Sequence, residues 1–521
     1  MPLNRREFLK QAGFLTAQAS LLSSLPVWAV SPGSAFPRTT PEAQGVSSEG
    51  LLNFIQTVEN EKLNLHSLMI LRKGKVIAEG WWKPYQADLK HTLYSLSKSF
   101  TSTAIGFAVS EKRLRVEDKI LSFFPDKAPT SVSANLAAMR VKDLLTMSTG
   151  HDKDTTGPIS QTDDWVKAFF EQPVQHQPGT FYVYNSGATY MLSALIEKLT
   201  GEKLLDYLTP RLFKPLDITG ADWEIDPKGI NTGGWGLRLR TEDIAKFGQL
   251  YLQEGKWQGK QLIPADWIKE ATQAQVESKG GNQPKESNDW LQGYGYQFWR
   301  CRHNAYRGDG AFGQFCIVIP EKEMVVVTTS ESGNMQGILN AVWNHILPAV
   351  GQLGSAGVQQ ELKKKLTSLA LPLTPGSPTS PLTATLSGKK ISVESNAQGI
   401  SQVQLNFHGK DFTLMLKDGT REHRIEGGIG YWKLGSTSLP LTALKLTRST
   451  LPKELPTRLA TSGAWSDEQT FLITLRYIES AHYDTLRVHI EGDKATLKFR
   501  RSLSIIDNTE DKRPVLEGKL A

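Results

Sequence analysis

A serine and a lysine stand three residues apart in the heptapeptide YSLSKSF, at Ser95 and Lys98. A serine hydroxyl is a weak nucleophile until a base takes its proton. On a helix, residues i and i+3 share one face, so the lysine would lie one turn above the serine. If that face is buried, desolvation lowers the lysine pKa and leaves a neutral amine that can act as this base. The helix N-terminus would also supply backbone N–H groups for a developing oxyanion.

The S-x-x-K spacing alone does not identify a nucleophile. It recurs at Ser387 and Lys390, in a stretch that looks like a hairpin surface, and a chain of this length should contain about one or two such matches by chance. Apolar residues after Ser95 are spaced as on an amphipathic helix with one buried face, at Phe100, Ala104, Phe107 and Ala108. We therefore predict Ser95 as the nucleophile and Ser97 as a helix-surface or packing residue.

A tyrosine lies at a predicted strand-to-helix corner, in the sequence Tyr184-Asn185-Ser186-Gly187. Such a tyrosine can point its phenol into a cleft. Beside a lysine ammonium its anionic form is favoured, which would make it a base. A core tyrosine with a satisfied hydroxyl explains the residue better when the motif is considered alone.

Four segments occur in one order: SLSK (95–98), VKDLLTMSTGHD (141–152), PGTFYVYNSGATYMLSALIEKLTG (178–201) and GGWGLRLRTEDIAKFGQLYLQEGKWQGKQLIPADW (233–267). Together they resemble the serine hydrolase family of class C β-lactamases, penicillin-binding D-alanyl peptidases and related esterases and amidases. The resemblance covers roughly residues 40–350. It implies an antiparallel sheet flanked by helices, beside a helical region, with the active site between them. It also implies Ser95 as nucleophile, Lys98 as its partner and Tyr184 as second base.

Two positions depart from the family pattern. The family commonly has Asn two positions after the tyrosine, where this chain has Ser186, which offers a single hydroxyl. Asp309-Gly310-Ala311 stands where the family usually has Lys-Thr-Gly on an edge strand. A carboxylate near the place of that lysine would disfavour substrates with a free carboxylate. Arg307 could replace the lysine or could pair with Asp309, and both alternatives stay open.

The glycines at 308, 310 and 313 spell G-x-G-x-x-G. A dinucleotide site needs a helix after this motif, whereas FCIVIP predicts a strand, so we reject that interpretation. The glycines would instead let substrate lie close to an edge strand. A backbone N–H of Ala311 or Phe312 would then complete an oxyanion hole with the N–H of Ser95. The predicted substrate-side residues are Ser186, Asp309, Gly310, Ala311 and Phe312.

No metal or cofactor is predicted. The sequence HDKD at 151–154 lacks zinc-like spacing, and no G-x-S-x-G nucleophile elbow occurs. The net charge of +7 is thinly spread, with its densest cluster at 363–365, which disfavours a nucleic-acid partner. We expect a small-molecule, short peptide or ester substrate. The sequence does not indicate the oligomeric state.

The predicted activity is hydrolysis of an ester or amide bond through an acyl-enzyme. Two alternatives remain: a β-lactamase or D-alanyl carboxypeptidase, and a penicillin-binding or sensor-type protein with little turnover. The missing Lys-Thr-Gly speaks against the first alternative. The joint presence of Ser95, Lys98 and Tyr184 speaks against an inactive relative.

The first 29 residues resemble a twin-arginine export signal. Arg5 and Arg6 precede Phe8-Leu9-Lys10, a mildly apolar stretch follows, and a small-residue cleavage site would end at Ala29. An amphipathic first helix is the alternative. We expect an exported, periplasmic or secreted protein without a transmembrane anchor, because no later apolar run is long enough to span a bilayer.

A chain of 521 residues is too long for one comfortable hydrophobic core. We expect an α+β hydrolase domain over 30–355, a linker over 356–380 and a separate antiparallel β domain over 381–521. Period-2 alternation predicts two hairpins in the last domain, with apolar residues at 403, 405, 407, 412, 414 and 416 and at 486, 488, 490, 495, 497 and 499. A structural role for this domain is favoured over carbohydrate binding.

Only two cysteines occur, Cys301 and Cys316. In an oxidising compartment they could form a disulfide worth about 3 kcal/mol. They could equally be two buried free thiols on adjacent strands.

Overall fold

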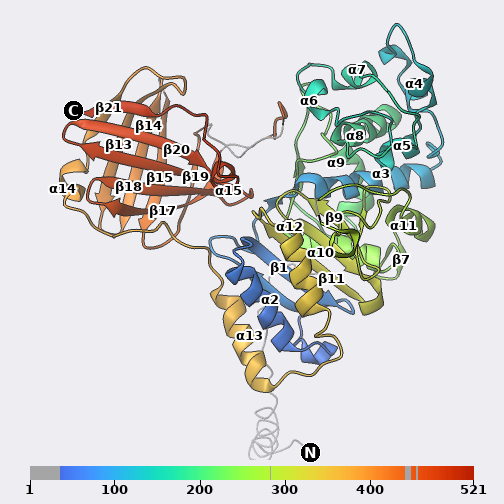
Figure 1. The fold of residues 1–521 in the computed structure, drawn as a ribbon, viewed down its shortest axis with the longest axis horizontal. Helices are drawn as coiled ribbons and strands as arrows, with labels where there is room; N and C mark the ends of the chain where they lie inside the picture. Colours follow the sequence, from blue (N-terminus) through green and yellow to red (C-terminus); the bar gives the residue numbers. More distant parts are fainter. Residues whose placement is uncertain (1–35, 282, 420, 440–446, 453–455) are drawn as a thin grey trace, which may run out of the picture.

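The computed structural model describes residues 36–281, 283–419, 421–439, 447–452 and 456–521. The predicted export signal, residues 1–29, lies outside these residues. Figure 1 shows a β domain at one side of the molecule and a larger domain at the other, in which helices flank a sheet. The predicted α+β class, with a second domain made of β-strands, is confirmed.

The larger domain is built on a six-stranded antiparallel sheet. Its strands, in spatial order, are β2 (Lys75–Trp81), β1 (Leu65–Arg72), β11 (Met324–Ser330), β10 (Gln314–Ile319), β9 (Tyr306–Gly310) and β8 (Trp299–Arg300). The inner strands β10 and β11 are buried along their whole length, because helices cover both faces. Their continuous apolar runs, rather than alternating ones, follow from this burial on both sides.

One face of the sheet carries α2 (Ser48–Asn60), α12 (Met335–Ala341) and α13 (Ala356–Ser368). The other face carries α10 (Thr241–Leu252), which packs its Phe247 and Leu250 into the core shared with the helical region. That region contains α3 (Ser97–Ser110), α4 (Ala134–Ala138), α5 (Val141–Leu145), α6 (Thr156–Ile159), α7 (Trp165–Phe170), α8 (Ser186–Thr200), α9 (Leu204–Leu208) and α11 (Ala265–Thr272).

Shorter elements connect these layers. A small sheet joins β3 (His91–Thr92), β5 (Leu237–Leu239) and β4 (Asp222–Trp223), and a two-stranded ribbon joins β6 (Lys256–Trp257) and β7 (Lys260–Gln261). The helical turns are η1 (Glu42–Gln44), η2 (Tyr94–Leu96), η3 (Ile120–Phe123), η4 (Pro125–Lys127), η5 (Thr209–Phe213), η6 (Lys285–Ser287), η7 (Pro320–Lys322) and η8 (Val342–Ile346).

Helix α3 was predicted to bury one face, and this prediction was wrong. Every residue from Ser97 to Ala108 is buried. The polar side chains that the pattern assigned to a solvent face are small hydroxyls, and most of them form hydrogen bonds inside the protein, Ser102 being the exception among the described residues of this helix. Thr103 Oγ1 donates to the Ser99 carbonyl at 2.9 Å, and Thr101 Oγ1 donates to the Gly233 carbonyl at 2.8 Å. A helix whose polar residues are satisfied in this way can be central to a domain.

The predicted linker over 356–380 is also corrected, because its first half is helix α13. This helix packs Leu362 and Leu366 into the core formed with α2, and Lys365 forms an ion pair with Glu59 of α2 at 2.6 Å. The apolar residues at 362, 366 and 369 follow helical spacing. Only the residues after this helix have the proline-rich composition typical of a linker, with Pro372, Pro375, Pro378 and Pro381.

The C-terminal domain is a ten-stranded barrel. Its elements are α14 (Leu382–Leu386), β12 (Lys390–Val393), β13 (Ile400–His408), β14 (Asp411–Asp418), β15 (Arg421–Ile429), β16 (Lys433–Thr437), β17 (Thr457–Asp467), β18 (Thr470–Tyr477), β19 (Tyr483–Glu491), β20 (Lys494–Arg501), α15 (Ser502–Ile506) and β21 (Leu516–Leu520). Most strands pair antiparallel with a neighbour in the sequence. The first and last strands, β12 and β21, also pair antiparallel, and a parallel pairing of β15 with β17 closes the barrel. The predicted hairpins are β13–β14 and β19–β20.

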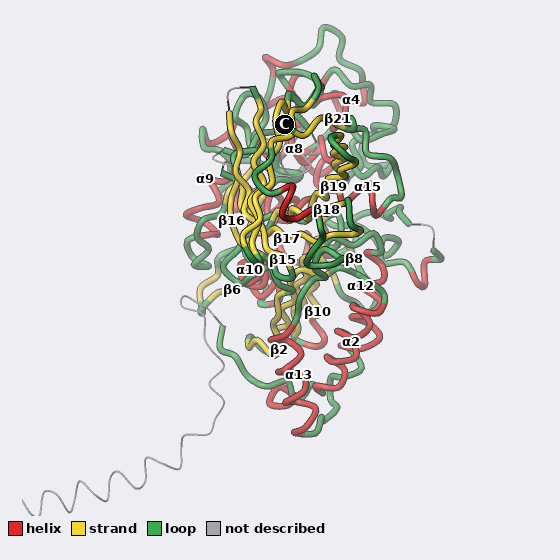
Figure 2. The backbone as a smooth tube through the Cα atoms, turned by 90° about the vertical axis from the view of Figure 1, so that its left-hand side faces the viewer, coloured by secondary structure: helices red, strands yellow, loops and turns green. Residues whose placement is uncertain are grey.

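The two domains contact each other through backbone and side chains. Ile225 and Thr450 exchange backbone hydrogen bonds of 2.8 and 2.9 Å. The Tyr85 hydroxyl donates to the Ser480 carbonyl at 2.9 Å. Figure 2 views the molecule from the barrel side, with the barrel strands in front of the larger domain. Within the described part of the chain, no helix combines the length and apolar character needed to cross a membrane.

Candidate active site

Ser95 lies in the helical turn η2, directly before α3. The preceding residue, Tyr94, has a φ of +46°, in the left-handed region. For a residue with a bulky side chain this conformation costs about 1–3 kcal/mol and persists only where the surroundings hold it. The turn is fixed from two sides, since the Leu93 N–H donates to the Leu237 carbonyl and the Ser97 hydroxyl accepts from the Leu237 N–H. Ser97 is thus a buried packing residue, not a surface one.

Lys98 is buried, with 1% of its surface exposed. Its ammonium donates to Ser95 Oγ at 3.0 Å, to Ser186 Oγ at 2.9 Å and to the Gly234 carbonyl at 2.7 Å. Burial lowers the Lys98 pKa to about 7, against the opposing attraction of Asp154 and Asp309. Lys390, the lysine of the second S-x-x-K match, is exposed. Burial of the lysine therefore distinguishes the Ser95–Lys98 pair from the second S-x-x-K match, Ser387–Lys390.

The acceptors around Lys98 orient its neutral form. A neutral amine keeps two N–H donors and one lone pair. The Gly234 carbonyl can only accept, and the Ser186 hydroxyl also accepts in this arrangement. When the amine donates to these two groups, its lone pair faces Ser95 Oγ. The geometry thus suits removal of the Ser95 proton by neutral Lys98.

Tyr184 lies against both residues. Its ring centroid is 4.9 Å from Lys98 Nζ, its side chain hydrogen-bonds Ser95, and it stacks on Trp299 at 5.6 Å between centroids. Burial raises the pKa of Tyr184, although the hydrogen bond to Ser95 opposes the shift. We predicted that a lysine ammonium would favour the anionic phenol, whereas burial favours the neutral one. Tyr184 is therefore suited to donate a proton.

The hydroxyl of Ser186, and not the amide of the neighbouring Asn185, is the group that faces Lys98. Ser186 Oγ faces Lys98, while Asn185 is fully buried and caps α8 by accepting from the Ala188 N–H. The Asn185 carbonyl oxygen also accepts from the N–H and hydroxyl of Thr155. The amide is thus committed to holding the helix start, and the serine hydroxyl is the group that meets Lys98.

Asp309 and Arg307 form a buried ion pair. Arg307 Nε donates to Asp309 Oδ2 at 2.9 Å, and Nη2 lies 2.7 Å from the same oxygen. Arg307 is fully buried, lies over the Trp290 ring and donates to the Asp289 carbonyl. Burial raises the pKa of Asp309, an effect that the guanidinium opposes. Of the two alternatives for Arg307, the structure shows pairing, and this guanidinium cannot reach a substrate carboxylate.

The glycines near Asp309 serve a different purpose from the one predicted. A Cβ on Gly308 would meet Leu96 Cδ1 at 2.3 Å, and one on Gly310 would meet the Leu93 carbonyl at 2.1 Å. The chain's own η2 segment, not a substrate, occupies the space beside them. Strand β8 pairs only with Tyr306 and Arg307 of β9, so Gly308, Asp309 and Gly310 have a strand neighbour, β10, on one side alone.

This close packing brings the turn after β9 next to the nucleophile. Ala311 and Phe312 follow Gly310, and the Phe312 ring packs edge-on against Tyr94 at 5.4 Å. Phe312 itself has a φ of +67°. The side chain of Phe312 thus lies against the residue that precedes Ser95.

Sequence reasoning missed three neighbours of the site. The Gly234 carbonyl bonds Lys98, the exposed Asp154 acts on the pKa of Lys98, and His482 of the barrel bonds Tyr94. Gly234 and Asp154 lie in or just after two of the segments that carried the resemblance, so those segments held a signal for them. A lone histidine in a predicted β domain offered none.

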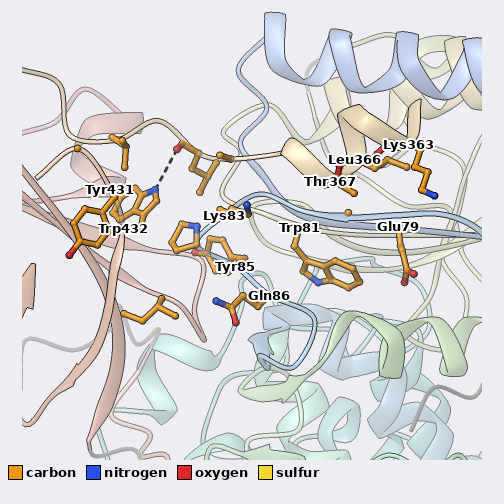
Figure 3. Close-up of a pocket in the computed structure, with 17 residues that line it drawn as sticks. Glu79, Trp81, Lys83, Tyr85, Gln86, Lys363, Leu366, Thr367, Tyr431 and Trp432 are labelled. Carbon is orange, nitrogen blue, oxygen red and sulfur yellow. Dashed lines mark hydrogen bonds between the residues drawn. The ribbon is translucent and has the colours of Figure 1, made fainter. Parts of the chain in front are cut away.

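A groove of about 930 Å³ lies between the two domains, apart from these residues. Figure 3 shows Tyr431 and Trp432 on its barrel side and Glu79 and Trp81 on strand β2. None of the predicted catalytic residues lines it. Trp432 Nε1 donates to the Leu371 carbonyl at 3.5 Å across the junction. The groove is a feature of the domain junction, not of the candidate active site.

Other candidate chemical groups are placed elsewhere. Cys301 and Cys316 are buried free thiols, as the second alternative expected, but not on adjacent strands, because Cys301 follows β8, Cys316 lies on β10 and β9 runs between them. His151 bonds Thr149, and Asp152 pairs with His176 at 2.6 Å. Among the residues that the structure describes, no group of three or more His, Cys, Asp or Glu side chains is arranged to hold a metal ion.

Comparison with known proteins identifies the family of this chain. The family model described as beta-lactamase matches residues 56–342. The 6-aminohexanoate-dimer hydrolase of Paenarthrobacter ureafaciens is 24% identical over 336 residues, which is 60% of this chain and 84% of that protein. The D-aminopeptidase of Brucella anthropi is 25% identical over 186 residues, 33% of this chain and 35% of that protein.

A solved structure from Bacillus anthracis, named as a candidate 6-aminohexanoate-dimer hydrolase, matches with a TM-score of 0.50. It is 18% identical, and the match covers 64% of this chain and 88% of that one. At this identity the similarity shows the fold alone. The family match spans more than half of the chain and contains Ser95, Lys98 and Tyr184. This chain therefore belongs to the beta-lactamase family and is a serine hydrolase.

Proposed function

We propose that the enzyme cleaves an ester or amide bond through an acyl-enzyme on Ser95. Neutral Lys98 takes the Ser95 proton as Oγ attacks the carbonyl carbon, and the backbone N–H groups of Ser95 and of Ala311 or Phe312 receive the oxyanion. Tyr184 protonates the leaving amine or alcohol and regains a proton from the Lys98 ammonium. Water, deprotonated by the same pair, then releases the acid. The 3.0 Å contact between Lys98 Nζ and Ser95 Oγ carries this proposal.

The substrate of this proposal carries a free amine near the scissile carbonyl rather than a free carboxylate. Asp154 is exposed and lies close enough to act on the pKa of both Lys98 and Tyr184. Its Oδ1 is held by the Thr156 hydroxyl and the Ser186 N–H. The buried Arg307 is occupied by Asp309. The name of one relative, a D-aminopeptidase, supports a free amine beside the scissile carbonyl.

A substrate panel tests this function. We expect turnover of p-nitrophenyl esters and D-amino acid amides, and a roughly two- to fivefold lower kcat/KM when the amine is acetylated, the size of an exposed ion pair. Asp154→Asn should remove that difference. Turnover of a chromogenic cephalosporin in preference to the amides would favour a β-lactamase instead. A penicillin adduct that persists for hours, measured by intact mass, would favour a binding or sensor protein.

We further propose that residues 1–29 direct export and are removed after Ala29, which would place the enzyme in the periplasm or outside the cell. The arginine pair and the small residue at the cleavage site support this. The mature protein should then begin at Val30 when the full chain is expressed in a bacterium with twin-arginine export. An exported protein that retains Arg5 and Arg6, identified by intact mass, would contradict it.

A further inference from the structure

His482 connects the C-terminal barrel to the residue before the nucleophile. It lies in the turn between β18 and β19 and is buried, with 3% of its surface exposed. Its Nε2 is 2.6 Å from the hydroxyl of Tyr94. Figure 1 shows α15, which follows the neighbouring strand β20, at the end of the barrel that faces the larger domain. A buried side chain of one domain thus reaches the active-site turn of the other.

The other side of the imidazole is fixed as well. Nδ1 of His482 is 2.5 Å from Oε1 of Glu331, which directly follows strand β11 of the larger domain. The Ser502 hydroxyl, at the start of α15, donates to the same carboxylate oxygen. A carboxylate accepts only, so Nδ1 carries a proton and donates to Glu331, and Nε2 shares a hydrogen bond with the Tyr94 hydroxyl. Every polar atom of this histidine then has a partner.

The three rings at this point pack against each other. The His482 ring lies edge-on to Phe312 at 4.9 Å and to Tyr94 at 5.8 Å, and Phe312 contacts Tyr94. Tyr94 and Phe312 both have left-handed backbones, which need support from their surroundings. Tyr94 directly precedes Ser95, whose N–H is one proposed oxyanion donor. The other proposed donor is the N–H of Ala311 or of Phe312 itself. His482 therefore contacts the side chains of two residues at the proposed oxyanion hole, Tyr94 before Ser95 and Phe312 after Ala311.

We propose that His482 is a positioning residue of the hydrolase site, so that the barrel takes part in catalysis by holding Tyr94 and Phe312. This inference rests on the proposed role of Ser95. A shift of the Tyr94 backbone would turn the Ser95 N–H and hydroxyl away from the reacting carbonyl. Displacements of about 1 Å at such groups can cost on the order of 100-fold in rate.

His482→Ala in the full chain tests the proposal. We expect kcat and the rate of fluorophosphonate labelling to fall roughly 10- to 100-fold, with KM nearly unchanged, because the lost support acts on the transition state and not on substrate binding. Tyr94→Phe should act in the same direction, and the double variant should be no slower than the slower single variant, because both remove one interaction. His482→Gln should restore part of kcat, since its amide can accept from Tyr94 and donate to Glu331.

Tyr477→Phe is the matched control. It removes a hydroxyl from the same barrel that bonds Asp484 of its own domain at 3.0 Å, so it should leave kcat unchanged. Wild-type kcat in His482→Ala, or equal losses of kcat in His482→Ala and Tyr477→Phe, would overturn the proposal while an inactive Ser95→Ala keeps the proposed function. If His482→Ala does not fold, Tyr94→Phe, which removes only one oxygen atom, replaces it in the test. A loss of kcat in Tyr94→Phe then supports the proposal, and wild-type kcat overturns it. Activity in Ser95→Ala would overturn the proposed function itself.

Discussion

Replacing Ser95 with alanine is expected to abolish hydrolysis and fluorophosphonate labelling. The hydroxyl is the atom that Lys98 and Tyr184 converge on, and no acyl-enzyme can form without it. We expect kcat/KM to fall roughly 10³-fold or more, the scale seen when a serine nucleophile is removed. Folding should be preserved, because Lys98 keeps its bonds to Ser186 and Gly234. Ester hydrolysis rates and intact mass after labelling measure the result.

Ser97→Ala provides the control for this experiment. Ser97 lies two residues away and is fully buried, and its hydroxyl accepts from the Leu237 N–H. Its removal should cost about 1–3 kcal/mol of unfolding free energy, because a buried donor loses its partner, while labelling persists. Undiminished labelling of Ser95→Ala, or loss of labelling in Ser97→Ala at full folding, would show that the wrong serine was assigned.

Period-2 patterns predicted the barrel hairpins well, because each strand has one face on the core. Leu486, Val488 and Ile490 of β19 and their partners on β20 are buried as predicted. The closure of the barrel had no such signal. It depends on Gly428 and Ile429 pairing parallel with Ser462 and Gly463, more than thirty residues away. Local alternation reports the environment of one strand and carries no information on such a distant partner.

The same pattern reasoning failed for two helices, α3, which is almost wholly buried, and α13, which buries only Leu362 and Leu366. In α3 the polar residues are Ser and Thr, which a periodicity argument assigns to solvent, whereas their hydroxyls bond carbonyls inside the protein. The proline-rich sequence after α13 led us to extend the predicted linker over this helix, which packs Leu362 and Leu366 into the core. In each case the missing information was the neighbouring element that supplies the contact.

Some residues of the candidate site could be predicted from local spacing, and others could not. Ser95 and Lys98 could be predicted as a pair because one helical turn fixes their distance. Tyr184 and Asp309 entered through the resemblance, and Arg307 could not be assigned until its burial and its bonds to Asp309 were known. His482 could not be predicted at all, since it reaches Tyr94 from 388 residues away in another domain. Sequence spacing describes local geometry, and these contacts arise only from the fold.

Lys98→Met is expected to lower kcat/KM roughly 10²- to 10⁴-fold, the range for loss of a general base. Methionine keeps the unbranched shape, but its thioether is not basic enough to take the Ser95 proton. In the wild type, kcat/KM should rise with pH and reach half of its maximum near pH 7, because burial lowers the Lys98 pKa to about 7 and only the neutral amine can act. Lys390→Met is the matched control, from the second S-x-x-K sequence, whose lysine is exposed. It should leave the pH profile unchanged.

The same substitution should change stability in a pH-dependent way. The pKa of Lys98 is about 7 in the folded protein, against 10.5 for an ordinary lysine. Between these values the unfolded chain binds more protons than the folded one, so the wild type gains stability as pH rises through this window. Methionine has no such dependence. The unfolding free energy of Lys98→Met relative to the wild type should therefore be highest at pH 6 and fall by about 2–3 kcal/mol at pH 9, measured by denaturant titration. A constant difference across this range would mean that Lys98 remains charged in the folded enzyme and cannot be the base, leaving proton removal from Ser95 to another group.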